Sequence, residues 1–190
     1  DIKDQIGFYN QLSATDMIFA HNKSDVKFYK GLFPGKKVFD IKTLMITDNV
    51  DGENGPKLDK TIIGGNFARW YGGFQSYAVA THFGNKIYGQ TSHAMMQVHL
   101  MPTVAAGTFS LNCAYWGIPC IGNQKVDTQR ICFPDLAVEN DDVEKAVDLA
   151  IKLRDEENFR NDVSEKAKEL YKKEYSEDVW LKNFMRNYEQ

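Results

Sequence analysis

A glycine and a hydroxyl residue, Gly107 and Thr108, stand at the start of a predicted helix. The glycine permits a ligand to approach the backbone closely. The first amides of this helix, those of Thr108, Phe109 and Ser110, have no acceptor within it and carry the positive end of its dipole. With two hydroxyl donors beside them, the stretch predicts an anion site, and we expect the phosphates of a nucleotide. The alternative is a core helix that Thr108 merely caps.

A pair of glycines, Gly64-Gly65, is followed by Asn66 where an earlier apolar run passes into a helix. These glycines also allow close approach, and Arg69 lies one helical turn further on. Its planar, permanently charged guanidinium suits a pyrophosphate. The spacing matches neither the dinucleotide-binding fingerprint nor the P-loop. A tight turn with a surface arginine is the alternative.

Polar side chains crowd a third segment, residues 122–135, which also follows an apolar run. The side chains able to hydrogen-bond sugar hydroxyls or a diphosphate are those of Asn123, Asp127, Thr128, Gln129 and Arg130. Ligands of open α/β sheets bind beyond the carboxyl ends of the strands, so three such segments at one edge form a candidate site. For any single residue, an ordinary polar crossover loop is the alternative.

The elements that must position these segments are short apolar runs alternating with helical segments. Runs of this kind are typical of buried parallel strands. The alternation predicts an α/β fold with a Rossmann-like, mainly parallel sheet flanked by helices. The expected strands are 16–20, 37–41, 61–64, 86–88, 98–101, 118–121 and 136–138.

Helical periodicity marks the segments between these strands and dominates the last third of the chain. Asn22 and Asn140 are expected to cap helices. Apolar stripes after Asn140 predict helices at 143–153, 159–171 and 179–185, so the C-terminus is helical. One earlier helix is expected to bury a face made of Trp70, Phe74, Tyr77 and Ala78.

A polar, turn-rich stretch at residues 47–57 divides the chain. We interpret it as a hinge or linker between a strand-helix-strand piece, residues 1–46, and a longer α/β unit, residues 58–190. The chain begins with Asp1 rather than Met, and we therefore expect it to be a piece of a longer protein.

Composition narrows the function classes. The 190 residues are 43% hydrophobic and 13% aromatic, enough for a packed core. The net charge of −3 gives no strong nucleic-acid signal. Three cysteines fit neither a disulfide framework nor a zinc site and suggest free thiols in a reducing compartment, so we expect a cytoplasmic protein. We find no apolar run long enough to span a membrane and no metal cluster.

These features resemble the C-terminal, donor-binding half of glycosyltransferases of the GT-B architecture, where two Rossmann-like domains face each other across a cleft. The resemblance rests on the glycine loop Ile63-Gly64-Gly65, on the helix opened by Gly107 that leads to the Gly117-Ile118-Pro119 turn, and on the paired terminal helices. It covers residues 58–190. Residues 1–46 resemble the end of the N-terminal acceptor domain, most of which is expected to lie outside this sequence.

The sequence departs from the pattern of this architecture at two positions that distinguish its subfamilies. Many retaining members carry two glutamates eight positions apart in this region, and here those positions are Val104 and Asn112. Asn112 is still able to hydrogen-bond a ribose or sugar hydroxyl, but it supplies no charge.

The resemblance implies transfer of a sugar from a nucleoside-diphosphate-sugar, with UDP among the candidate nucleotides, to an unidentified acceptor. The amides near Gly107 and the Arg69 cation would stabilise the leaving diphosphate, and Asn123 and Asp127 would hold the donor sugar. No metal and no separate cofactor is implied. We assign no catalytic residue, because the general base of an inverting enzyme usually comes from the N-terminal domain; His21 is a weak candidate to line the cleft.

Three other functions remain open from the sequence. An epimerase of the UDP-N-acetylglucosamine 2-epimerase type shares the architecture but uses carboxylates, which are scarce in these loops. A non-catalytic nucleotide-binding module is favoured slightly by Val104 and Asn112. A transferase that acts on nucleic acid is not supported by the net charge.

Overall fold

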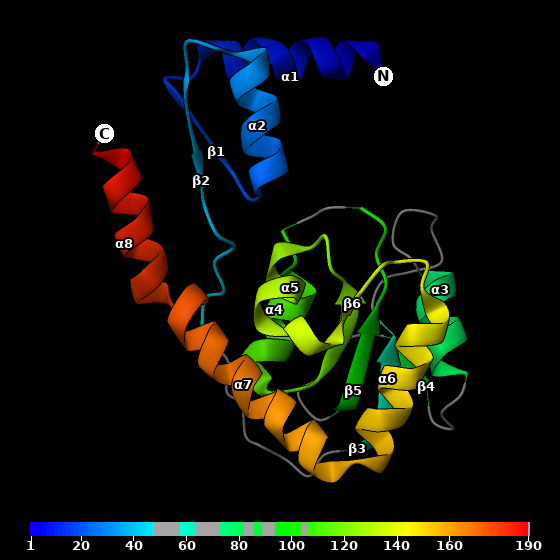
Figure 1. The fold of residues 1–190 in the computed structure, drawn as a ribbon. Helices are drawn as coiled ribbons and strands as arrows, with labels where there is room; N and C mark the ends of the chain where they lie inside the picture. Colours follow the sequence, from blue (N-terminus) through cyan, green and yellow to red (C-terminus); the bar gives the residue numbers. More distant parts are fainter. Residues whose placement is uncertain (48–57, 64–72, 82–85, 89–93, 104–105, 190) are drawn as a thin grey trace.

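The computed structural model describes residues 1–47, 58–63, 73–81, 86–88, 94–103 and 106–189. Two parallel sheets form the fold, a two-stranded one near the N-terminus and a five-stranded one in the rest of the chain (Figure 1). Helices flank both sheets. The predicted α/β class, with parallel strands and a helical C-terminus, is therefore confirmed.

The five-stranded sheet has the order β4-β3-β5-β6-β7 with every pair parallel. Its strands are β3 (Leu58–Ile63), β4 (Lys86–Tyr88), β5 (Ala94–His99), β6 (Cys120–Asn123) and β7 (Ala137–Val138). The chain moves outward from β3 to β4 on one side and through β5, β6 and β7 on the other. The direction of winding reverses between β3 and β5, and doubly wound sheets bind ligands beyond this reversal.

Helices cover both faces of the large sheet. On one face α3 (Gly73–Ala80) contacts α6 (Val143–Asp155), and on the other α4 (Thr108–Trp116), α5 (Asp127–Cys132) and α7 (Glu157–Tyr175) pack together (Figure 1). A single 3₁₀ turn, η2 (Pro134–Leu136), precedes β7. The central strands are buried on both sides, as Val98 and Ile121 show with 0% exposure. This explains why their sequences are continuous apolar runs.

The small sheet pairs β1 (Met17–Ala20) with β2 (Lys37–Asp40) through α2 (Lys23–Leu32). The Asn22 cap is confirmed, since its Oδ1 accepts a hydrogen bond from the Asp25 amide at 2.8 Å. The buried cluster is small: Ile18, Phe33 and Val38. A further helix, α1 (Ile2–Ala14), precedes β1 and was not expected from the sequence.

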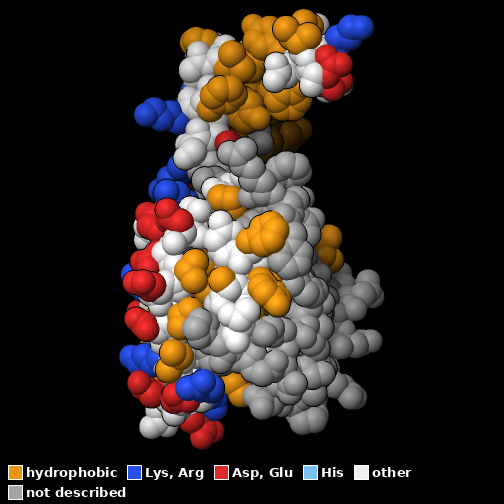
Figure 2. All heavy atoms as spheres, turned by 90° about the vertical axis from the view of Figure 1, so that its right-hand side faces the viewer, with side chains coloured by type: hydrophobic (Ala, Val, Ile, Leu, Met, Phe, Trp, Pro, Cys, Tyr) orange, Lys and Arg blue, Asp and Glu red, His pale blue; other side chains and the backbone are white. Residues whose placement is uncertain are grey.

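The helices of the small unit leave part of their apolar surface exposed, although Leu12, Val26 and Tyr29 pack against the small buried cluster. Neither α1 nor α2 contains a buried residue. Figure 2 shows hydrophobic side chains gathered at this end of the molecule. Large exposed examples are Ile2, Ile6, Phe8 and Phe28.

The terminal helices link the two units. After α7, α8 (Glu177–Tyr188) runs alongside the small sheet (Figure 1). The rings of Phe184 and Phe19 lie 5.3 Å apart, and Trp180 Nε1 donates to the Lys42 carbonyl at 2.8 Å. These contacts hold α8 against the first part of the chain.

One predicted helix face is wrong. Phe74 is 66% exposed and Tyr77 40%, whereas Ser76 and Val79 are buried. The small side chains let α3 pack closely on the sheet, and the Ser76 hydroxyl accepts a hydrogen bond from the Leu100 amide at 2.9 Å. Burial here therefore follows size and hydrogen bonding rather than aromatic content. Trp70, the remaining large member of that predicted face, lies outside the described residues.

Several predicted boundaries are also wrong. Helix α6 is capped by Asp142, which accepts from the Lys145 amide at 3.1 Å, and not by Asn140. Strand β5 begins at Ala94 and ends at His99, earlier than expected. It includes the polar Gln97, which pairs with Cys120 of β6. Backbone pairing sets the strand limits, and a polar side chain within the run does not end it.

Candidate functional site

The three predicted ligand segments follow β3, β5 and β6, which are neighbouring parallel strands. Their carboxyl ends therefore meet at one edge of the sheet. Gly64, Gly65, Asn66 and Arg69, which follow β3, lie outside the described residues, as does Val104. The segments after β5 and β6 define the part of the edge that the structure describes.

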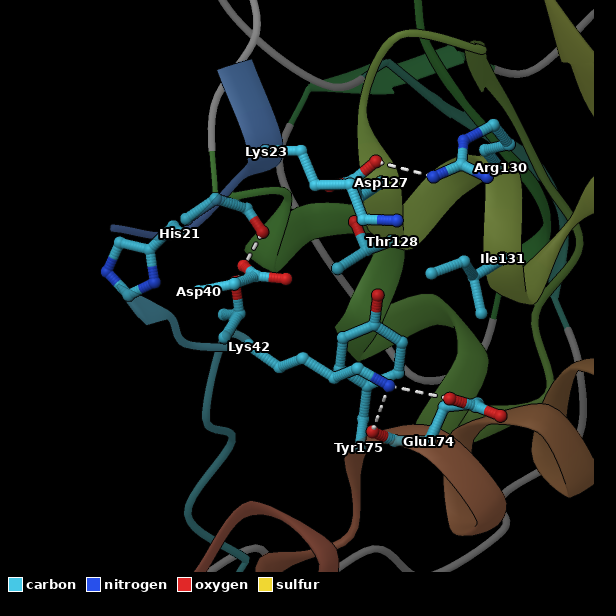
Figure 3. A pocket seen from close by; sticks show the side chains of 12 residues that line it. His21, Lys23, Asp40, Lys42, Asp127, Thr128, Arg130, Ile131, Glu174 and Tyr175 are labelled. Atoms are coloured by element: carbon cyan, nitrogen blue, oxygen red, sulfur yellow. Dashed lines mark hydrogen bonds and ion pairs between the residues drawn. The ribbon is translucent and has the colours of Figure 1, made fainter. Parts of the chain in front are cut away.

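A cavity of about 260 Å³ lies beside this edge, between the large unit and the small one (Figure 3). The small sheet also presents its carboxyl end here, because His21 follows β1 and Asp40 ends β2. The cavity thus lies between two carboxyl edges, a little below the usual size range of small-molecule sites. Its lining residues are His21, Lys23, Asp40, Lys42, Thr43, Ala106, Asp127, Thr128, Arg130, Ile131, Glu174 and Tyr175.

The start of α4 is anchored at this cavity by its neighbours. Gly107 has a φ of 74°, a conformation that favours glycine. A Cβ at this position would lie 1.9 Å from the Thr128 hydroxyl oxygen. That hydroxyl donates to the Gly107 carbonyl at 2.7 Å, and the Thr43 hydroxyl donates to the Ala106 carbonyl at 2.5 Å. Glycine is therefore required at 107 by packing alone, independently of any ligand.

Two predicted ligand-binding side chains have structural bonds. Buried Ser110 donates its hydroxyl proton to Gln129 Oε1 at 2.8 Å. Asn123, 1% exposed, donates to the Met101 carbonyl at 2.6 Å and accepts from the Lys125 amide at 2.9 Å. Their side chains hold the loops after β5 and β6 together. Their predicted contacts with a ligand stay a prediction.

The other predicted residues differ in their access to solvent. Thr108 is exposed at the first position of α4, Phe109 and Asn112 are half-buried, and Asp127 and Thr128 line the cavity. Ala106, immediately before the amides at the start of α4, lines the cavity. The predicted anion site at these amides stays a prediction.

Charges around the cavity are balanced in pairs. Lys42 Nζ lies 2.6 Å from Glu174 Oε2 and also over the Tyr175 ring. Arg130 Nη2 lies 2.7 Å from Asp127 Oδ1. In Figure 3 both pairs border the cavity, and the Lys23 side chain extends along its rim. The lining as a whole has three cationic side chains, Lys23, Lys42 and Arg130, and three carboxylates, Asp40, Asp127 and Glu174, so its formal charges cancel.

Asp40 carries a shifted carboxyl group. Burial raises the pKa of Asp40, and the Asp127 carboxylate raises it further, while Lys23 and Lys42 act in the opposite direction. A carboxyl group with a raised pKa in a cleft is a candidate for proton transfer. The Lys42 hydrogen bond lowers the pKa of Glu174 instead, so this second carboxylate stays ionised.

His99 closes the end of β5. Its ring lies 4.6 Å from the Phe109 ring, between centroids, and burial lowers the pKa of His99 to about 4. It is therefore a neutral residue at the rim of the core at neutral pH. His21, by contrast, lines the cavity.

Eight of the twelve lining residues were not among the candidates predicted from the sequence. Asp40 lies in the predicted strand 37–41 and Lys42 directly after it, whereas Glu174 and Tyr175 lie between the predicted helices 159–171 and 179–185. Glu174 and Tyr175 reach the cavity because α7 ends beside the cleft, more than a hundred residues from Lys42 in the chain. One signal was available: polar residues after an apolar run, as in Asp40 and Lys42, mark a carboxyl edge.

Two parallel α/β units with a cavity between their carboxyl edges form a GT-B glycosyltransferase-like fold. Solved structures with this fold include a mutant of S. aureus TarM in complex with fondaparinux, alpha-GlcNAc-glycerol and UDP. The structural match covers 99% of this chain and 47% of the TarM chain, with a TM-score of 0.73 and 10% sequence identity. A second match is to a chain of the GtfA/B complex. It covers 94% of this chain and 46% of that chain, with a TM-score of 0.64 and 10% sequence identity.

The chain spans about half the length of these solved structures. No family model and no curated protein matches its sequence. Among the described residues, no helix combines the length and apolar character needed to cross a membrane.

Proposed function

We propose that this protein transfers a sugar from a nucleoside-diphosphate-sugar, with UDP as the first candidate nucleotide, to an unidentified acceptor. The observation that carries the proposal is the cavity between the two carboxyl edges, with the start of α4 beside it. The fold supports the reaction class, and UDP in the TarM complex supports the choice of nucleotide.

We assign the leaving diphosphate to the amides at the start of α4. As the bond between the anomeric carbon and the phosphate oxygen breaks, negative charge grows on the phosphate. Preoriented amides at a helix N-terminus stabilise such charge. The hydrogen bonds from Thr43 and Thr128 support this role, because they fix the turn that presents the amides. Gly64, Gly65, Asn66 and Arg69 are proposed to complete the diphosphate site.

The donor sugar and ribose are proposed to lie along the same edge. Asp127 and Thr128 line the cavity, and Asn112 and Asn123 lie in the helix and strand beside it. No separate cofactor is proposed. We further propose that residues 1–46 are the end of an acceptor domain, that 47–57 are the hinge, and that 58–190 form the donor domain.

The exposed apolar side chains of α1 support this division. A two-stranded parallel sheet with three buried residues is too small to be stable alone. Further strands and helices of an acceptor domain would cover these surfaces and would supply most of the acceptor site. The present chain is then chiefly a donor-binding half.

The test is isothermal titration of this chain with UDP, GDP and ADP, in wild type and in two variants of Thr108. Thr108→Asp places a negative charge beside the α4 amides, where it would repel a diphosphate. The same charge favours the helix dipole, so the fold is retained. We expect UDP binding to weaken about tenfold or more in Thr108→Asp and to change little in Thr108→Asn.

Gly107 is unsuited to this test, because any side chain there collides with Thr128. Equal UDP affinity in wild type and Thr108→Asp would contradict the phosphate assignment. Absence of binding by all three nucleotides would contradict the donor-binding role of this chain. Thermal melting of each variant confirms that the comparison is made between folded proteins.

A nucleotide-binding module without catalysis is the second candidate. The observation that favours it is Asn112, an uncharged residue where many retaining members carry a glutamate. Binding of UDP without release of sugar from UDP-sugars, measured with the longest available form of the protein, would select the module.

A further inference from the structure

A second cavity, of about 430 Å³, lies on the other side of the Lys42–Glu174 ion pair. It shares Asp40, Lys42 and Glu174 with the first cavity, so these three side chains form a common wall. Its opposite side is the polar face of α8. No local sequence pattern predicts a site here, because Lys42 and Glu174 of this wall are more than 130 positions apart in the chain.

The polar face of α8 supplies groups that both donate and accept hydrogen bonds. Asn183, Arg186 and Asn187 line the cavity from this helix. Arg186 Nη2 donates to Asn183 Oδ1 at 3.0 Å, and Asn187 Nδ2 donates to the Asp40 carbonyl at 3.3 Å. These two contacts align the amide groups along one side of the cavity.

The formal charges of the described lining cancel. Lys42 and Arg186 are cations, and Asp40 and Glu174 are anions. A phosphate or another strongly charged ligand would find no net attraction. Hydroxyl groups both donate and accept, and amides beside carboxylates match them without a requirement for charge. The lining therefore fits a neutral, hydroxyl-rich molecule.

We propose that this cavity binds a neutral sugar or polyol. If the proposed sugar transfer is correct, this ligand is part of the acceptor, because the cavity adjoins the donor cleft through Asp40 without overlapping the α4 start. The assignment of this ligand as part of the acceptor rests on that proposed function, whereas the binding of a neutral sugar here is independent of it.

The experiment follows the side-chain amide signals of Asn183 and Asn187 by two-dimensional ¹⁵N NMR of the whole chain. The probe is N-acetylglucosamine, and its charged counterpart N-acetylglucosamine 6-phosphate serves as the comparison. Both are titrated at millimolar concentrations. We expect saturable shifts of both amides with the neutral sugar and weaker binding of the phosphate form.

Two variants and one control test the location. Asn183→Ala and Arg186→Ala each remove a hydrogen-bonding group from the cavity-lining face of α8, and we expect the neutral sugar to bind about tenfold more weakly. Asn161→Ala, on an exposed position of α7 outside the cavity, is the control and should leave binding unchanged. Alanine favours helix, so the three variants are expected to fold.

The proposal is overturned if the neutral sugar causes no saturable shift, if the phosphate form binds more tightly, or if both α8 variants bind as wild type does. A UDP titration of the same samples separates the two proposals. Sugar binding without UDP binding keeps this site and rejects the donor role. UDP binding without sugar binding keeps the donor role and rejects this site.

Discussion

The two parallel sheets of this protein differ in how completely they are covered. The five-stranded sheet has helices on both faces and a continuous buried core that includes Leu111, Ile121 and Leu153. The two-stranded sheet buries only Ile18, Phe33 and Val38, and its helices expose apolar side chains. Because apolar burial is the main stabilising term in folding, the large unit should fold independently and the small unit should depend on its neighbours.

The largest expected effect tests this difference directly. Leu153→Ala, in the core of the large unit, should lower the free energy of unfolding by about 2–5 kcal/mol, since it leaves a cavity at a fully buried position. Val38→Ala should scarcely change the main urea transition and should instead speed amide exchange across residues 17–40. A comparable loss in the main transition for both variants would show that the two units unfold together.

The next effect is the dependence of folding stability on pH through His99, at the end of β5 in the large sheet. Burial lowers the pKa of His99 to about 4 in the folded protein, from the ordinary histidine value of 6.5. The unfolded chain therefore binds more protons between these values, and stability should fall by about 3 kcal/mol as the pH drops from 6.5 to 4.

Two measurements check this prediction. NMR titration of the His99 ring gives its pKa directly, and His99→Gln should flatten the stability curve across this window. A ring that titrates near 6.5 would mean that the carboxyl edge is more open than the buried core beneath it.

A smaller effect concerns the contact between α4 and α5. Gly107→Ala should cost about 1–2 kcal/mol for the left-handed backbone, plus the collision with Thr128. Thr128→Ala in the same chain should recover part of the loss, because it removes the hydroxyl that lies nearest to the new Cβ. Urea titration of the single and double variants measures this coupling. Strict additivity would contradict the packing explanation for Gly107.

The smallest effect lies at the joint between the units. Lys42→Met removes the ion pair with Glu174, which should cost less than about 1 kcal/mol because both side chains are partly exposed. The Lys42 hydrogen bond lowers the pKa of Glu174 in the folded state, so this stability is present above the ordinary glutamate value of 4.5 and is lost as the pH falls below it. The variant should therefore lose less stability than wild type on acidification below that value.

The sequence by itself determined the fold class and part of the site. Continuous apolar runs indicated strands buried on both faces, and Asn22 marked the start of a helix, because these signals depend on local chemistry. The positions of Gly107, Asp127 and Thr128 after apolar runs indicated a carboxyl edge. Boundaries failed where backbone pairing overrode side-chain type, as at Gln97, and the α3 face failed where small residues allowed close packing.

Only the tertiary structure decided which side chains share the cleft. It placed Glu174 and Tyr175 against Lys42, set α8 beside the small sheet, and put the Thr128 hydroxyl where a side chain at 107 would lie. It also created the second cavity between Asp40 and α8. Each of these arrangements depends on how α5, α7 and α8 dock on sheets formed by distant residues. Such docking minimises exposed apolar area over the whole chain, and no local pattern encodes it.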